Sequence, residues 1–538
     1  MKKLICKIFL NKKMIVISIY FGLVNSFLFK NVLTQLLFSG LRFEGRSYLY
    51  QFILFVAYTL FFTLIWFVAI NNSVVFQKQI YKFEQNIDKC KYLFRNDAKK
   101  RIGVTLVSIG IGICLIFIVN NLLAHINTVT WQYETKNIIP IMKPIGNDFR
   151  VGLYTPAQNL IKTNFKSIGL DGSFISIYPP LVSVVSLVYL IFNYETAYLI
   201  HVGLLILANT ACLGLASLMV KELVLPGLKL ESFYISLIAG FLFFVMAVYT
   251  FSSYSFIFAM ERGNVDIFAM LFSMLTMWCL LKRPGRIWLQ VVLLSIAVHF
   301  KIYPAALFVI LLYRHGKKIF LPAISVNLAF LLILGPRFAL GFIRALTSGS
   351  GIGGGVGNKW TGILNHSSYS FSDSLTKIFS NLSSNLFLLW GFFTLVPLLL
   401  WVIAMYKLIK KTNQTENIVL MLMVTVPFMD LVPTISMDYK LVILNTSILI
   451  LIALILKNIF QKPSWIELFQ LSLLFVIMLF IGRPYAMSEK NMYLLKESEM
   501  FLINNKYLWV LALEFLMVFA IYRKYTLDKI DILNSKNK

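Results

Sequence analysis

Charge is scarce in this chain, and negative charge is scarcer still. Only 14% of the 538 residues are charged, with 23 acidic against 50 basic side chains, whereas 59% are hydrophobic. Apolar stretches of roughly 18 to 25 residues, each long enough to cross a bilayer as a helix, recur along the sequence. The segments between them leave no obvious place for a soluble domain. The composition therefore predicts an all-α polytopic membrane protein.

Cysteine is also rare, and the patterns that hold metals or nucleotides are missing. The five histidines show no metal-ligand spacing, and no Walker-type or dinucleotide-type glycine motif occurs. The glycine-rich stretch 348–360 follows a span, not a strand, and is interpreted as an outer loop. No disulfide scaffold is expected, because all five cysteines fall in predicted cytoplasmic segments or spans: Cys6, Cys90, Cys114, Cys212 and Cys279. We therefore expect no metal and no cofactor.

The basic residues indicate the topology. Loops assigned to the inside hold 31 of the 50 basic residues although they are the shorter set, as the positive-inside rule requires. An even number of spans places both termini in the cytoplasm, and the net charge of +27 then reflects topology and not nucleic-acid binding. The apolar stretch 178–192 breaks this parity if it spans, so it is interpreted as a re-entrant or interfacial helix. About 14 spans are predicted: 14–39, 48–71, 103–125, 196–220, 233–256, 264–281, 287–300, 302–313, 319–343, 384–406, 417–435, 440–456, 464–482 and 508–523.

One predicted span carries charge at its outer end. In "FIFAMERGNVDIFAMLF", residues 256–272, apolar residues are interrupted by Glu261, Arg262, Asn264 and Asp266. A charged side chain at the centre of a membrane helix costs roughly 2.5–3.5 kcal/mol, so charges are kept where they are solvated or used. Arg262 and Asp266 are i and i+4 and can pair on one face of a helix. The motif therefore indicates either an ion pair that caps a helix or part of a site.

Other polar clusters are predicted at the same face of the membrane. The long outer loop 126–177 contains Asp148 and Tyr154, and loops of this length are often functional. The turn "HFKIYP" contributes Lys301 and Tyr303, and further clusters are "GILNHSSYSFSDSL", with His366, and "VPTISMDYKLVIL", with Lys440. One face thus gathers carboxylates, cations and aromatic side chains, as a site at the outer surface would require.

Each cluster also has a purely structural interpretation. Lys301 can snorkel to the membrane interface, and Asp438 with Lys440 can be a flanking charge pair that sets topology. A lone histidine in an outer loop, such as His366, is usually solvated. Asp148 can be an ordinary exposed aspartate. The residues by themselves leave these alternatives open.

In their order, the motifs resemble those of glycosyltransferase family 87, the polyprenyl-phosphate-dependent membrane transferases of the GT-C type. The resemblance covers roughly residues 103–456 and rests on these motifs: "DFRVGLYTPA" (148–157), "YPPL" (178–181), "RGNVD" (262–266), "KIYP" (301–304), "NHSSYS" (365–370) and "SMDYKLVIL" (436–444). Where the family more often has Gln and Asn after Arg-Gly, this chain has Asn264 and Asp266. Contacts to the sugar are therefore expected to differ.

The resemblance implies a GT-C-like fold with a large first outer loop, and transfer of one sugar with inversion at the outer face. The donor would be a polyprenyl-phosphate sugar, mannose-like or arabinose-like, and the acceptor a hydroxyl of a cell-envelope glycolipid or glycan. Asp148 occupies the position of the family's aspartate base. A positioned carboxylate typically contributes 10²–10⁴-fold by taking the proton of a hydroxyl. Cations stabilise the charge that develops on a leaving phosphate.

These expectations assign roles to named residues. Asp148 is the predicted base, and Tyr154 and Tyr178 are predicted to support its loop. The donor phosphate and sugar are predicted to contact Arg262, Asn264, Asp266, Lys301, Tyr303, Lys440 and His366. Besides donor and acceptor, the expected partners are membrane lipids.

The domain organisation and two rival classes complete the sequence-based picture. We expect an N-terminal extension (1–102), a catalytic transmembrane region (103–456) and C-terminal spans with a basic tail (457–538). A secondary transporter or lipid flippase should show internal repeats and ionisable groups near mid-membrane, and neither is evident. A lipid-linked glycan ligase or polymerase is closer in chemistry and typically relies on a later outer loop.

Overall fold

Regular structure is helical throughout the residues that the computed structural model describes, and none of them forms a named strand. One antiparallel bridge, between Asn365 and Met437, is the only extended pairing among them. The described residues are 146–169, 173, 178–228, 232–348, 365–378, 386–410, 414–433, 435–461, 464–482 and 506–536. All lie in one unit, Ile139–Lys538. The extension 1–102, the first three predicted spans and the glycine-rich stretch after Ser348 lie outside the described residues.

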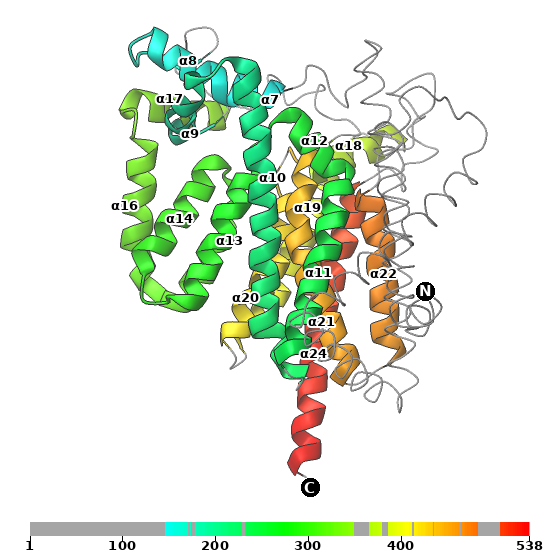
Figure 1. Ribbon diagram of the computed structural model, residues 1–538. Coiled ribbons are helices and arrows are strands. Elements are labelled where there is room, and N and C mark those ends of the chain that lie inside the picture. Colours follow the sequence, from blue (N-terminus) through cyan, green and yellow to red (C-terminus); the bar gives the residue numbers. More distant parts are fainter. Residues whose placement is uncertain are drawn as a thin grey trace, which may run out of the picture. The chain divides into compact units, whose positions relative to one another are not determined.

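Several helices in the described ranges are continued directly by a turn of 3-10 or π-helix, and Figure 1 shows how the α-helices are arranged. In chain order they are α7 (Asn147–Phe149), η1 (Arg150–Tyr154), α8 (Thr155–Lys162), α9 (Pro180–Val185), η2 (Ser186–Ile191), α10 (Tyr194–Met219), η3 (Val220–Val224), η4 (Leu225–Leu228), α11 (Ser232–Ser252), α12 (Tyr254–Arg262), α13 (Asp266–Lys282), α14 (Ile287–Phe300), η5 (Tyr303–Leu307), α15 (Phe308–His315), η6 (Gly316–Ile319), α16 (Phe320–Leu331), α17 (Pro336–Ser348), α18 (Ser368–Ile378), α19 (Leu386–Ile409), α20 (Gln414–Leu431), η8 (Asp438–Ile443), α21 (Leu444–Gln461), α22 (Trp465–Gly482) and α24 (Lys506–Lys536).

Several of these helices are long and apolar enough to cross a membrane. Four qualify by length and composition, and up to six if each of two bent pairs counts as one span. The membrane-protein class is thereby supported, whereas the predicted count of about 14 spans is not confirmed for the part of the chain described. The four are Tyr194–Val224, Leu386–Ile409, Asp438–Gln461 and Trp465–Gly482.

Two predicted spans are broken by identifiable residues. The stretch predicted as 233–256 ends at Ser253, whose side chain caps α12 by accepting a hydrogen bond from the amide of Phe256 (3.3 Å). The α11 and α12 axes then differ by 60°. The stretch predicted as 319–343 bends by 96° before α17, because Gly335 adopts φ +95° and Pro336 starts the new helix.

The core of the bundle is α21. In the apolar stretch within Asp438–Gln461, 94% of the residues are buried, whereas in the apolar stretch of α19 only 6% are. Helix α19 exposes large apolar side chains such as Phe387 and Leu388. A helix that is apolar all round and enclosed by α10, α11, α20, α22 and α24 is a central helix. The apolar outer face of α19 is what a lipid-facing helix requires.

At one end of the bundle, buried ion pairs link three of these helices. Glu416 at the start of α20 contacts Lys457 near the end of α21 (2.8 Å) and Lys524 of α24 (3.2 Å). All three side chains are almost inaccessible to solvent. Because removing one partner of a buried pair leaves a charge without compensation, this cluster fixes how the helices align. The polar residues of the predicted site lie at the opposite ends of α20 and α21.

Candidate functional site

A single turn between α12 and α13 presents three of the predicted site residues. Helix α12 ends at Arg262, and Gly263 adopts the left-handed conformation with φ +65°. The Asn264 side chain then accepts a hydrogen bond from the amide of Asp266 (3.0 Å), where α13 begins. A Cβ at position 263 would lie 2.7 Å from the Cβ of Phe149. Glycine is therefore required here both by conformation and by close packing.

The segment that carries Asp148 docks on this turn. The amide of Gly146 donates to the carbonyl oxygen of Glu261 (2.7 Å). One carboxylate oxygen of Asp148 accepts from Nε of Arg262 (3.0 Å) and also from its Nη2, and the other accepts from Nδ2 of Asn264 (2.8 Å). The predicted pair between Arg262 and Asp266 is wrong. Gly263 ends the helix between them, and Arg262 turns to Asp148.

Aromatic side chains hold this segment in place. Phe149 is fully buried, and its ring packs against a group of rings at centroid distances of 4.8–6.0 Å: Tyr154, Tyr189, Tyr194, Tyr198 and His201. Such pairs contribute about 0.5–1.5 kcal/mol each beyond burial. The structure thus places Tyr154 beside the segment that it was predicted to support.

Polar atoms of two of these rings also form hydrogen bonds with the backbone of the α12–α13 turn. Tyr198 donates its hydroxyl hydrogen to the carbonyl oxygen of Met260 (2.7 Å). His201 contacts the carbonyl oxygen of Gly263 through Nε2 (3.0 Å) and the hydroxyl of Tyr189 through Nδ1 (2.8 Å). Because these bonds reach the backbone on both sides of Arg262, α10 fixes the position of the site.

Asp266, Lys301 and Tyr303 form a second group beside the first. The Tyr303 hydroxyl donates to one oxygen of Asp266 (2.8 Å), and Nζ of Lys301 lies 3.4 Å from the other. Lys301 also lies over the ring of Tyr178, 4.9 Å from its centroid. The structure thus brings together residues that the sequence places in three separate motifs.

Exposure distinguishes the members of these two groups. The side chains of Asp148 and Lys301 are 15% and 20% exposed, whereas those of Arg262 and Asp266 are 5% and 2% exposed. Burial opposes the charge on Lys301, but Asp266, Tyr178 and Asp148 outweigh it and raise the pKa of Lys301 well above its ordinary value. Burial also raises the pKa of Tyr178 to about 12. Asp148 and Lys301 are therefore the more accessible charged side chains of the two groups, and their charges interact.

A cavity of about 400 Å³ opens next to Lys301. Its polar end is formed by Tyr178, Lys301 and Tyr303. The rest of its wall is largely apolar and comes from the residue before α9, from the end of α14 and the turn after it, from α17 and from the end of α20: Pro179, Phe300, Ile302, Ala306, Phe342, Phe428, Met429, Val432 and Pro433. This volume lies within the range of ligand pockets. Its shape suits a ligand with an anionic head and an apolar tail.

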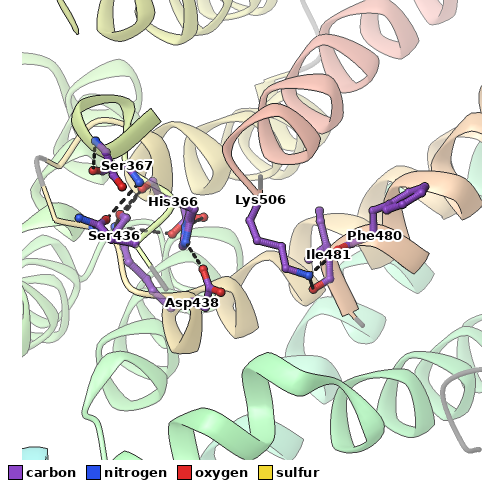
Figure 2. Close-up of polar contacts among 11 residues, drawn as sticks. His366, Ser367, Ser436, Asp438, Phe480, Ile481 and Lys506 are labelled. Carbon is purple, nitrogen blue, oxygen red and sulfur yellow. Dashed lines mark hydrogen bonds and ion pairs between the residues drawn. The ribbon is translucent and has the colours of Figure 1, made fainter. Parts of the chain in front are cut away.

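His366 is the centre of a buried carboxylate pair. Its Nδ1 lies 2.9 Å from Asp438 and its Nε2 lies 2.9 Å from Asp430, and all three side chains are inaccessible to solvent. Figure 2 shows the contact with Asp438, together with Ser367 and Ser436 beside the ring. Burial would lower the pKa of His366, but the two carboxylates outweigh it and raise the pKa to about 9. The structural interpretation of His366 as a solvated loop histidine is thereby wrong.

Lys440 connects the His366 cluster with the cavity. Its ammonium group donates to the carbonyl oxygen of Met429 (2.7 Å) and to Oγ of Ser436 (3.0 Å), and lies over the ring of Tyr303, 4.3 Å from its centroid. Because Lys440 is almost fully buried, its contacts are with the protein. A direct contact of Lys440 or His366 with a donor phosphate stays a prediction.

Two members of this site were missed by the sequence reasoning. Asp430 lies within the apolar run of α20, and a lone carboxylate in such a run is itself a signal of function. Tyr439 lies in the motif "SMDYKLVIL" but was assigned no role, although its side chain interacts electrostatically with Asp148 and Lys301. No group of three or more His, Cys, Asp or Glu side chains suited to a metal ion occurs among the described residues.

Comparison with known proteins finds one family model that matches part of the chain, including several residues of this site. Residues 176–433 match the family model described as glycosyltransferase family 87. No curated protein and no solved structure matches the chain. The matched range includes the α12–α13 turn, the cavity's polar end and His366, while Asp148 and Lys440 lie outside it.

Proposed function

Residues 176–433 of this chain belong to glycosyltransferase family 87, and from that membership we propose which sugar transfer the protein performs. The donor is a polyprenyl-phosphate sugar, mannose-like or arabinose-like. The acceptor is a hydroxyl of a cell-envelope glycolipid or glycan. The reaction inverts the configuration at the transferred carbon.

The observation that carries this proposal is that Asp148 and Lys301, the more exposed charged side chains of the two groups, interact electrostatically. Asp148 uses three of its roughly four lone-pair sites for Arg262 and Asn264, which leaves room for the proton of an acceptor hydroxyl. The same contacts fix the direction of that remaining site. A carboxylate held in this way and still 15% exposed suits a general base.

Lys301 and the cavity account for the donor. A phosphate beside Lys301 would face the hydroxyls of Tyr178 and Tyr303, and the first part of a polyprenyl chain would occupy the apolar wall beyond them. Nη1 of Arg262 is buried and has no hydrogen-bond partner among the residues that the structure describes. An unpaired guanidinium N–H of this kind is costly unless a substrate oxygen accepts from it.

The proposed step is a single displacement. The acceptor oxygen forms a bond to the anomeric carbon of the sugar while the bond from that carbon to the phosphate oxygen breaks. The proton of the acceptor goes to Asp148, and the lipid phosphate leaves with its charge balanced by Lys301. Fixed cations of this kind typically supply several kcal/mol of transition-state stabilisation, because they need no reorganisation.

The site is proposed to face the outside of the cell, with both termini in the cytoplasm. Helix α13 begins at Asp266 in the site and ends at Lys282, and α14 returns from Ile287, after Arg286, to Phe300 beside Lys301. The basic residues of this hairpin thus lie at the end away from the site, which the positive-inside rule assigns to the cytoplasm. The catalytic region is proposed to extend over 103–456, beyond the matched range, with 1–102 and 457–538 flanking it.

The test is transfer of labelled sugar by membranes that contain the wild type or Asp148→Asn. Short-chain polyprenyl-phosphate mannose, arabinose and glucose serve as donors. We expect transfer by the wild type to fall at least a hundredfold in the variant at equal protein level. Glu222→Gln, in a half-exposed pair with Lys282 far from the site, is the matched control. Equal transfer by Asp148→Asn and wild type would remove Asp148 from the reaction.

A further inference from the structure

The hydroxyl of Tyr439 is placed where it can reach a substrate. Among the residues that the structure describes it has no hydrogen-bond partner, and its side chain is only partly buried. It interacts electrostatically with Asp148, Asp266, Lys301 and Tyr178. These groups include the proposed base, Asp148, and the cation proposed to bind the phosphate, Lys301.

Packing explains how the ring reaches this space. Tyr439 lies against Phe258 of α12, with ring centroids 5.4 Å apart. One helical turn after Phe258 comes Arg262, on the same face of the helix. The ring of Tyr439 therefore packs on α12, the helix whose Arg262 holds the proposed base Asp148. The same helix positions both side chains.

The neighbours of Tyr439 are locked on either side. Asp438 is held by His366 (2.9 Å), and His366 donates its amide hydrogen to the carbonyl oxygen of Ser436 (2.8 Å) (Figure 2). Lys440 is held by carbonyl oxygens and Ser436 on the other side. Because both neighbours point into the protein, the 3-10 turn η8 leaves Tyr439 to face the site. The His366 cluster thus acts as the support that orients this turn.

We propose that Tyr439 contacts the donor and donates its hydroxyl hydrogen to a non-bridging oxygen of the phosphate that leaves. This inference rests on the proposed function. The bond gains strength as negative charge develops on that oxygen, so it acts mainly in the transition state and less in substrate binding. For Tyr439, His366 is a positioning residue, because it holds the turn that carries Tyr439.

Steady-state transfer by Tyr439→Phe tests the proposal. The phenylalanine keeps the packing on Phe258 and removes only the hydroxyl. We expect kcat to fall at least tenfold, and up to the 10²–10³-fold typical of a lost donor, with the donor KM and the melting temperature in detergent unchanged. Tyr406→Phe, on the exposed side of α19, should match the wild type in all three.

Each other outcome overturns the proposal. An unchanged kcat means that the hydroxyl does not touch the leaving phosphate. A fall in kcat accompanied by a matching fall in melting temperature means that Tyr439 is a packing residue. A raised KM at unchanged kcat assigns it to uniform binding. If the wild type transfers sugar from no donor, the proposed function fails and this inference fails with it. If the wild type transfers sugar and Tyr439→Phe transfers it equally well, only the role of Tyr439 fails.

Discussion

Substitution of Gly263 by alanine tests whether the α12–α13 turn positions the proposed base. The new Cβ would lie 2.7 Å from the Cβ of Phe149 and 3.2 Å from the ring of Tyr198. Ordinary contacts between carbon atoms are about 3.5–4.0 Å, so one side must move by roughly 1 Å. Phe149 is fully buried within its ring of aromatic side chains and has no space to retreat.

The expected magnitude has two parts. A non-glycine residue in the left-handed region costs roughly 1–2 kcal/mol, and over-packing of a tight site costs a further 1–3 kcal/mol. The free energy of unfolding should therefore fall by about 2–5 kcal/mol. Asp148 directly precedes Phe149 in α7, so a shift of Phe149 also displaces Asp148. A displacement of about 1 Å in a reacting group can lower the rate about a hundredfold.

Thermal unfolding in detergent and labelled-sugar transfer measure the two effects. Gly203→Ala in α10 is the matched control, because nothing lies within 4 Å of its added Cβ and alanine is favoured over glycine within a helix by about 1 kcal/mol. If Gly263→Ala retained the melting temperature and the transfer rate of Gly203→Ala, our account of the turn would be refuted.

Two further predictions concern stability. The two carboxylates raise the pKa of His366 from 6.5 to about 9, so protonated His366 stabilises the folded protein fully below pH 6.5 and this stabilisation is lost as pH rises through 9. The melting temperature of the wild type should therefore fall between pH 6 and 10. In His366→Gln this part of the pH dependence should be absent. Glu416→Gln leaves Lys457 buried without its carboxylate and leaves Lys524 with Asp528 alone. It should lower the free energy of unfolding by about 3–5 kcal/mol, while the donor KM, measured on the folded fraction, should not change. A pH-independent wild type, or a Glu416→Gln protein as stable as Glu222→Gln, would contradict these two expectations.

Local patterns predicted some of the boundaries and missed others. The predicted span 264–281 agrees with α13, Asp266–Lys282, within two residues, and 464–482 agrees with α22. The breaks at Ser253 and Gly335 were missed, because continuous hydropathy conceals a capping serine or a glycine with positive φ. Hydropathy reports how much of a segment prefers lipid, and it does not report where the backbone turns.

Composition, apolar length and the order of motifs are properties of the chain alone, so the membrane class, the helical content and the family that residues 176–433 match were predictable without a structure. Which charges meet depends instead on how the helices pack. Arg262 pairs with Asp148, 114 residues away, and not with Asp266 four residues away. His366 lies between carboxylates, and its contact with Asp430 crosses 64 residues. The reason is physical: helical periodicity governs neighbours three or four residues apart, whereas partners across the bundle are chosen by how Gly263, Phe149 and α10 pack together.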